Sequence, residues 1–115
     1  MTYDTAYLLA KELRASDEYK RLIKAQSEVE KDEATLKMVR DFMTLQMQWE
    51  YSRMAKTEEA EKFLEKLQPL SMLINNNPAA REYVEAYTYW SHVFQDVYKI
   101  VSGPMSEGVK ILEKE

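Results

Sequence analysis

Cysteine is absent from the sequence, histidine occurs once, glycine twice and proline three times. Without cysteine, the chain offers no disulfide, no thiolate metal ligand, no cysteine nucleophile and no cysteine-bound iron–sulfur cluster. Two glycines cannot form the glycine-rich loops that bind nucleotides. All-β proteins need a turn roughly every 8–12 residues and place Gly, Pro and Asn there. The shortage of these residues therefore predicts long helices.

The sequence also lacks a long block of one charge sign and a long apolar run. Lys and Arg number 16 against 20 Asp and Glu, a net charge of −4. Because phosphate binding needs a basic surface, direct nucleic-acid binding is not expected. No apolar stretch approaches the roughly 20 residues that span a bilayer, and the first residues do not resemble a signal peptide. We therefore expect a cytoplasmic protein without membrane contact.

The 115 residues, 45% of them hydrophobic and 31% charged, have the size and balance of one globular domain. A chain of this size is expected to bury about two-thirds of its surface around one core. Apolar periodicity predicts an all-α fold, an antiparallel bundle or hairpin of about five helices, two of them long. The expected helices are roughly 4–15, 17–31, 33–56, 58–75 and 78–102, with a short C-terminal tail at 104–115 in a single domain 1–115.

Polar residues in front of the apolar repeats mark the expected helix starts. The N-cap candidates are Ser16, Asp32, Thr57 and Asn77. Pro78 strengthens the last of these, because proline is pre-shaped for the first helical position. Pro69 instead lies inside the pattern of the helix 58–75, where it removes a backbone donor. A kink or a break is expected there.

The two longest helices carry the candidate core and interface residues. Apolar residues of 33–56 form two parallel stripes, so two packing partners are expected. The first stripe comprises Met38, Phe42, Leu45 and Trp49, and the second comprises Leu36, Val39, Met43, Met47 and Met54. An aromatic stripe on 78–102 has steps that match the first stripe of 33–56, so we expect these two helices to pack against each other antiparallel. The candidate residues are Met38, Phe42, Met43, Leu45, Met47, Trp49, Tyr83, Tyr87, Trp90, Phe94 and Tyr98.

Seven methionines, eight tyrosines and two tryptophans are many adaptable or amphipathic side chains for one small core. Methionine adapts its shape to a partner, and Tyr and Trp are enriched at protein interfaces. Covering this surplus predicts self-association, as a homodimer or a higher oligomer. The expected activity is therefore protein–protein contact.

No catalytic, cofactor or metal site is predicted. His92 is the only histidine, so the paired motifs of di-iron bundles and of His-Glu-x-x-His zinc sites cannot be built. The carboxylate pairs Glu58 with Glu59 and Glu61 with Glu65 are interpreted as a solvated helix face.

Two alternatives to a protein-contact role stay open. One is an enzyme whose site lies around His92 and includes Tyr89 and Glu85. The other is an RNA-associated module or RNA-decay accessory protein, which would need one basic face. That face would consist of Lys11, Arg14, Lys20, Arg21 and Lys24.

A diffuse set of residues carries a family resemblance. Its members are Leu9-Ala10, Leu13, Ser16-Asp17-Glu18-Tyr19, Val29, Asp32-Glu33-Ala34, Phe42, Gln46, Asn77-Pro78, Tyr83 and Gly103-Pro104. In these features the chain resembles the YlbF/YmcA family of small bacterial helical proteins over about residues 5–105. Its short length resembles the compact YheA-like branch.

The resemblance implies a cytoplasmic helical protein that forms homodimers or larger assemblies and has no established enzymatic activity. It further implies a regulator or adaptor linked to competence, sporulation and biofilm formation. The implied partners are other family members and a complex containing an RNA-cleaving enzyme, endoribonuclease Y. Some members carry a cysteine-bearing tail linked to iron–sulfur binding. Because this chain has no cysteine, no cofactor is expected for it.

Overall fold

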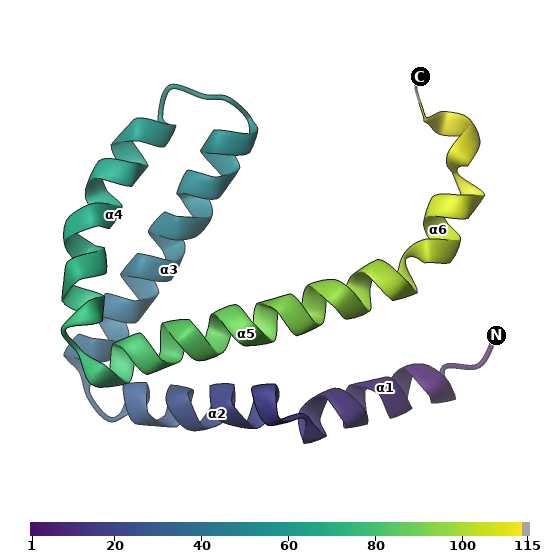
Figure 1. Cartoon of the computed structure of the whole chain (residues 1–115), viewed down its shortest axis with the longest axis horizontal. Helices are drawn as coiled ribbons and strands as arrows, with labels where there is room; N and C mark the ends of the chain where they lie inside the picture. The colour runs from purple at the N-terminus through teal and green to yellow at the C-terminus, as the bar shows by residue number, and fades with distance from the viewer. Residues whose placement is uncertain (114–115) are drawn as a thin grey trace.

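The computed structural model describes residues 1–113 as a helical hairpin and an antiparallel helix pair that meet at an angle (Figure 1). The helices are α1 (Asp4–Ala15), α2 (Asp17–Glu30), α3 (Glu33–Met54), α4 (Ala60–Asn75), α5 (Pro78–Val101), the short α6 (Gly103–Gly108) and a 3₁₀ turn, η1 (Lys110–Leu112). One arm pairs α3 with α4, and the other pairs α2 with α5. The predicted all-α fold is confirmed, and residues 1–113 contain no strand. Of the expected tail, residues 114–115 lie outside the described residues.

Three of the predicted N-caps are present in the structure. Backbone N–H groups of Tyr19, Thr35 and Ala80 donate to the side chains of Ser16, Asp32 and Asn77 at 3.2, 3.2 and 3.1 Å. Each bond satisfies a donor that the first helical turn leaves unpaired. Local chemistry therefore fixes where α2, α3 and α5 begin.

The predicted cap at Thr57 is wrong, because α4 begins only at Ala60 and has no side-chain cap. Thr57 belongs instead to the end of α3, where its N–H donates to the carbonyl of Ser52 at 3.0 Å. The N–H of Lys56 donates to the carbonyl of Arg53, and Lys56 has a φ of 57°. This pattern is a Schellman ending, in which glycine usually takes the left-handed position.

Helix α4 runs without interruption through Pro69, so the alternative of a break is wrong. Proline cannot donate to the carbonyl four residues earlier, which belongs to Glu65. Both residues are exposed. Water can therefore replace the missing bond, and the helix continues.

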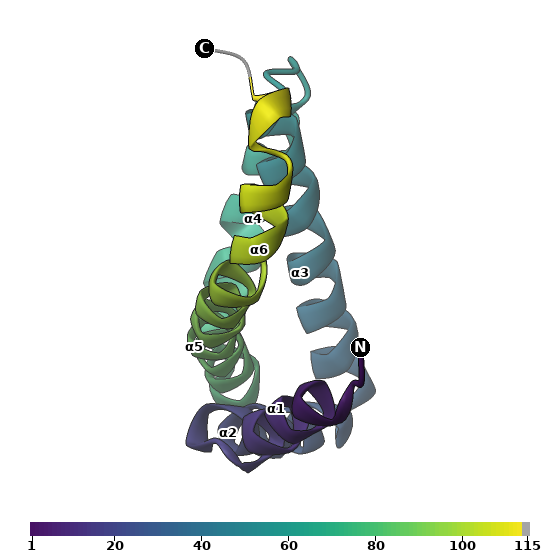
Figure 2. The ribbon, with the colours of Figure 1, turned by 90° about the vertical axis from the view of Figure 1, so that its right-hand side faces the viewer.

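The expected antiparallel packing of the two long helices on each other is wrong. Helix α3 packs along its length on α4, and α5 packs on α2. Helices α3 and α5 meet near the vertex of the two arms and then diverge (Figures 1 and 2). The physical reason is that α4 covers the first stripe of α3 with Leu67 and Ile74, while Leu22 and Ala25 of α2 cover the small residue Ala86 of α5. The spacing of an apolar stripe therefore does not decide which helix packs on it, and each long helix packs mainly on a neighbour other than the expected one.

The two arms are joined at the vertex by hydrogen bonds between helix caps. The side-chain nitrogen of Asn77, the cap of α5, donates to Thr35 Oγ1 at 3.1 Å. Thr35 Oγ1 donates in turn to Asp32 Oδ2, the cap of α3, at 2.7 Å. The hydrogen bond from the Thr35 side chain, and secondarily the one from its backbone N–H, holds the pKa of Asp32 below its usual value. Thr35 is buried, so this chain of bonds is partly shielded from water and couples the starts of α3 and α5.

The chain is flat and open rather than compact. It measures 46 × 39 × 16 Å, and its radius of gyration is 17.9 Å, whereas a compact chain of this length has about 13 Å. Its accessible surface is 9649 Å², against about 6,600 Å² for a compact monomer of this mass. The chain therefore buries about half of its unfolded surface, not two-thirds.

The expectation of one core is wrong as well, because the buried apolar residues form two clusters. The larger cluster lies in the α3–α4 arm and at the vertex, and comprises Val29, Val39, Phe42, Leu67, Ile74 and Ala80. The smaller lies between α2 and α5 and comprises Leu22, Ala25 and Ala86. Tyr83 packs against both clusters.

Candidate protein-interaction surface

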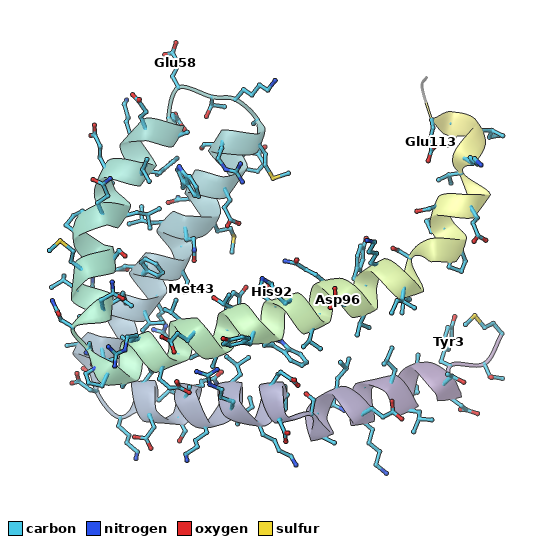
Figure 3. The ribbon with its side chains drawn as sticks, viewed as in Figure 1. Tyr3, Met43, Glu58, His92, Asp96 and Glu113 are labelled. Carbon is cyan, nitrogen blue, oxygen red and sulfur yellow. The ribbon has the colours of Figure 1, made fainter. Side chains whose placement is uncertain are left out.

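The inner side of the angle between α3 and α5 forms a surface that we call the inner cleft. Its hollow of about 290 Å³ is lined on α3 by Met43 and Met47 and on α5 by Tyr87 and His92. Figure 3 shows Met43 and His92 on the sides of α3 and α5 that face each other. Met43, Met47 and the ring of Tyr87 supply the apolar part of this lining, and the remaining lining residues are polar: Gln46, Glu50, Thr88, Ser91, His92 and Gln95. Protein-binding grooves combine apolar and polar groups in a similar way.

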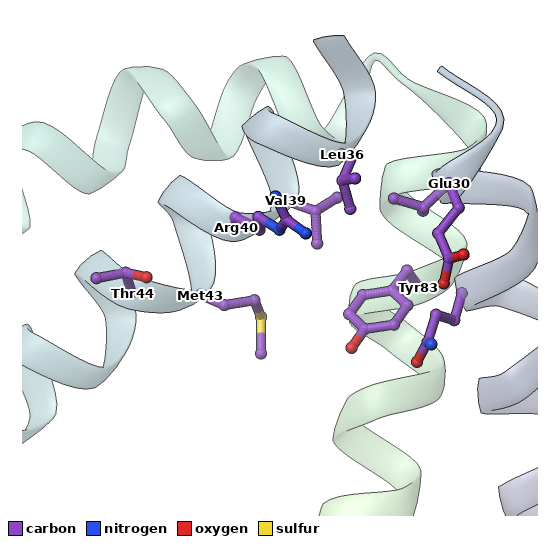
Figure 4. Close-up of a pocket in the computed structure, with 9 residues that line it drawn as sticks. Glu30, Leu36, Val39, Arg40, Met43, Thr44 and Tyr83 are labelled. Carbon is purple, nitrogen blue, oxygen red and sulfur yellow. The ribbon is translucent and has the colours of Figure 1, made fainter. Parts of the chain in front are cut away.

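The apolar part of the inner cleft is the second stripe of α3. At the vertex, Leu36, Val39 and Met43 of this stripe lie in or against the core, and Val39 and Met43 line a hollow together with Tyr83 (Figure 4). Farther along α3, Met47 and Met54 are 70% and 77% exposed. The predicted second packing partner of α3 is therefore present at the vertex and absent along the rest of the described helix.

The aromatic stripe of α5 divides between core and surface. Tyr83 is half-buried, and burial raises the pKa of its hydroxyl. Its ring stacks on that of Tyr87, with centroids 6.4 Å apart. The ring centroids of Trp90 and of Tyr19 from α2 lie 5.3 Å apart, in an edge-to-face arrangement. These contacts hold Tyr87 at the margin of the core, where it lines the inner cleft.

The structure places the eleven candidate residues in three environments. Those within or against the core of the α3–α4 arm are Met38, Phe42, Leu45 and Trp49. Those at the boundary between core and surface are Met43 and Tyr87, which line the inner cleft, and Tyr83 and Trp90, which pack against buried residues. Those exposed by half or more are Met47, Phe94 and Tyr98. Only the second and third groups are available to a partner.

A salt bridge fixes α2 on α5. The guanidinium of Arg21 donates to both carboxylate oxygens of Glu82 at 2.8 Å, and one of its nitrogens lies 3.4 Å from Glu85. The same guanidinium lies 5.2 Å from the ring centroid of Tyr89. The hydrogen bond from Arg21 lowers the pKa of Glu82. Bidentate geometry gives this pair a defined position as well as attraction.

These contacts bear on both alternative functions. Arg21 is directed at acidic groups of α5, so it does not complete a free basic face with the exposed lysines of α1 and α2. Glu85 and Tyr89 contact Arg21, whereas His92 lines the inner cleft. The hollow that contains His92 therefore does not bring the three proposed catalytic residues together.

The carboxylates interpreted as a solvated face lie at the tip of the α3–α4 arm. Glu58, Glu59, Glu61 and Glu65 are all exposed. Within residues 1–113, no three acidic or histidine side chains are grouped so that they could hold a metal ion. None of the helices in this range combines the length and apolarity that a bilayer crossing needs.

Sequence reasoning did not single out the exposed apolar side chains at the far end of the α2–α5 arm. Among these are Tyr7, Leu8, Ile100 and Met105, each more than half exposed. They lie beside the stripes rather than on them, so periodicity gave them no weight. Their exposure becomes visible only because nothing in the described subunit covers this end of the arm.

Fold and surface together define a small helical protein in which a hairpin, α3–α4, and an antiparallel pair, α2–α5, leave apolar side chains exposed within residues 1–113. The chain belongs to the family described as control of competence regulator ComK, YlbF/YmcA, whose model matches residues 2–106. The resemblance noted from the sequence is thereby confirmed. A UPF0342 protein of Desulfitobacterium hafniense is 36% identical over 99 residues, which cover 86% of this chain and 80% of that protein.

Two solved structures share the fold. A protein of unknown function (DUF964) from Bacillus stearothermophilus matches with a TM-score of 0.69 at 21% identity, over 91% of this chain and 92% of that one. Bacillus subtilis RicA, solved in complex with RicF, matches with a TM-score of 0.54 at 16% identity, over 91% and 93% of the two chains. At these identities the likeness concerns the fold alone.

Proposed function

We propose that this protein is a regulatory adaptor, which acts as a homodimer or larger homo-oligomer and binds a helix of another protein in its inner cleft. One observation carries the proposal: within residues 1–113, no helix covers the second apolar stripe of α3 beyond the vertex, and this stripe faces the aromatic edge of α5. An uncovered stripe of this kind is the receiving half of a helix-in-groove contact.

The chemistry of the cleft suits an amphipathic partner helix. The flexible thioethers of Met43 and Met47 can adapt to branched or aromatic side chains. Tyr87 supplies an apolar ring and a hydroxyl at the edge of the cleft, where a hydroxyl can remain hydrated. A role of this kind depends on affinity and needs no catalytic centre.

The family supports the same role. Its description refers to control of a competence regulator, and RicA, which shares the fold, was solved in complex with RicF. We extend this to the present chain by proposing other members of the family as partners. We propose that it serves competence, sporulation and biofilm formation. We further propose that it works with a complex containing endoribonuclease Y.

The test compares the proteins recovered with tagged variants from the native cell by quantitative mass spectrometry. The cleft variant is Met47→Lys with Tyr87→Ser, and the control is Met72→Lys on α4, outside the cleft lining. Met47 and Met72 are 70% and 67% exposed, so neither charge disturbs the core. We expect the parent and the control to recover the same partners and the cleft variant to lose them. Recovery of the same partners with the cleft variant would contradict the proposal.

A further inference from the structure

We infer that a second copy of this chain packs on the far end of the α2–α5 arm, through a two-fold interface centred on the C-terminal half of α5. We call this region the distal surface and define it by Leu8, Phe94, Tyr98, Val101 and Met105. The inference takes from the proposed function only that the chain associates with itself. It places self-association apart from the inner cleft.

Few internal partners cover this end of the arm within the described residues. Within residues 1–113, α1 contacts only α2, and α6 contacts only α5 and η1. No residue of α1 or α6 is buried, and none of α5 is buried beyond Ala86. A helix of 12 residues such as α1 is marginal in water on its own. The end of this arm therefore consists of helices whose apolar side chains still need a neighbour.

The exposed surface is also large enough for a stable dimer interface. The subunit exposes roughly 3,000 Å² more than a compact monomer of its mass. Stable homodimers bury roughly 2,000–5,000 Å² counted over both subunits, which is about 1,000–2,500 Å² from each. One such interface fits within the surplus and leaves area for a partner in the inner cleft.

The charges at this end of the arm favour a second copy over an unlike partner. The ionisable side chains of α1 and of residues 94–101 balance, with Asp4, Glu12 and Asp96 against Lys11, Arg14 and Lys99. A two-fold interface joins this surface to an identical surface, so a surface of one charge sign would repel its copy. A balanced surface does not, and it offers no excess charge to attract an oppositely charged protein.

The spacing of the exposed residues on α5 provides the seam. Phe94, Tyr98 and Val101 are four and three residues apart, so they share one face of the helix. They are 53%, 65% and 60% exposed. Two copies of such a face can interdigitate when the helices cross in antiparallel directions. Both copies of each side chain, one in each subunit, are then buried.

The association test measures the mass of the full chain by light scattering after size exclusion at micromolar concentration. The parent and the control Met72→Glu are expected at twice 13.6 kDa. The double variant Phe94→Glu with Tyr98→Glu is expected at the monomer mass, with its dimer dissociation constant raised about 1,000-fold, because each change acts twice across the axis. Tyr98 and Met72 are 65% and 67% exposed in the subunit, so helical circular dichroism should not change.

Crosslinking gives an independent readout, because the parent contains no cysteine. Under mild oxidation, Tyr98→Cys is expected to form a covalent dimer and Met72→Cys to remain monomeric on a denaturing gel. A double glutamate variant that stays dimeric, or a crosslink at residue 72 and not at 98, overturns the inference while self-association stands. A monomeric parent overturns both this inference and the homo-oligomer of the proposed function. Partner binding in the inner cleft is tested separately by Met47→Lys with Tyr87→Ser.

Discussion

Replacing Asn77 tests the hydrogen bonds that join the two arms. The Asn77 side chain accepts from the N–H of Ala80 at 3.1 Å, which caps α5, and donates to buried Thr35 at 3.1 Å. Loss of an N-cap costs about 1 kcal/mol. Loss of a hydrogen bond to a buried hydroxyl costs about 1 kcal/mol more. Asn77→Ala should therefore lower the free energy of unfolding by about 2 kcal/mol.

A second variant separates the two contributions. Asn77→Ser keeps an oxygen that can cap α5 but is too short to reach Thr35, so it should lose only about 1 kcal/mol. In a Thr35→Val background, Asn77→Ala should likewise cost about 1 kcal/mol, because only the cap remains to be lost. The measurement is urea unfolding followed by circular dichroism at a single protein concentration, since association would shift the apparent stability.

The double-mutant cycle supplies the decisive comparison. A coupling energy of about 1 kcal/mol between residues 35 and 77 is expected if the side chains are hydrogen-bonded. A coupling near zero, or equal losses for Asn77→Ser and Asn77→Ala, would refute the argument that Asn77 ties the start of α5 to α3. The angle between the arms would then have to depend on apolar packing alone.

Three further predictions follow from burial, helix chemistry and ionisation. Ile74→Ala should lower the free energy of unfolding by about 3 kcal/mol, because Ile74 is 3% exposed, whereas Met47→Ala, at 70% exposure, should change it by less than about 0.5 kcal/mol in chemical denaturation. Pro69→Ala should raise thermal stability by about 2 kcal/mol, because α4 already continues through an exposed proline. The pKa of Glu82 is lower in the folded state than its ordinary value of 4.5, so the unfolded state binds more protons and stability falls as the pH drops through the lowered pKa. Glu82→Gln should flatten that part of the pH profile, and an unchanged profile would contradict the assigned role of the Arg21 bond.

Helix positions were predictable because their causes are local. The caps Ser16, Asp32 and Asn77 act within one turn of the chain, and the apolar repeat needs only its own helix. The end of α3 was harder to predict, since Lys56 takes a left-handed conformation that is usually marked by glycine. The cap predicted at Thr57 is wrong for the same reason, because the backbone N–H of Thr57 takes part in the end of α3 and not in the start of α4.

Long-range packing was not predictable from periodicity, because a stripe does not specify which helix will cover it. The aromatic stripe of α5 matches the first stripe of α3 in spacing, yet α4 covers the stripe of α3, and α2 covers only the part of the α5 stripe around Trp90. Arg21 illustrates the same point: as a sequence element it belongs to a basic group, but the fold directs it to Glu82. The candidate site was therefore found as a list of residues without its geometry.

The sequence by itself determined an all-helical chain, the starts of three helices and a surplus of apolar side chains. The tertiary structure decided which of these side chains are covered. Phe42 and Met43 are adjacent and both apolar, but α4 packs on the side of α3 that carries Phe42 and leaves Met43 at the inner cleft. Burial depends on which distant segment arrives, and that choice is made by the whole fold.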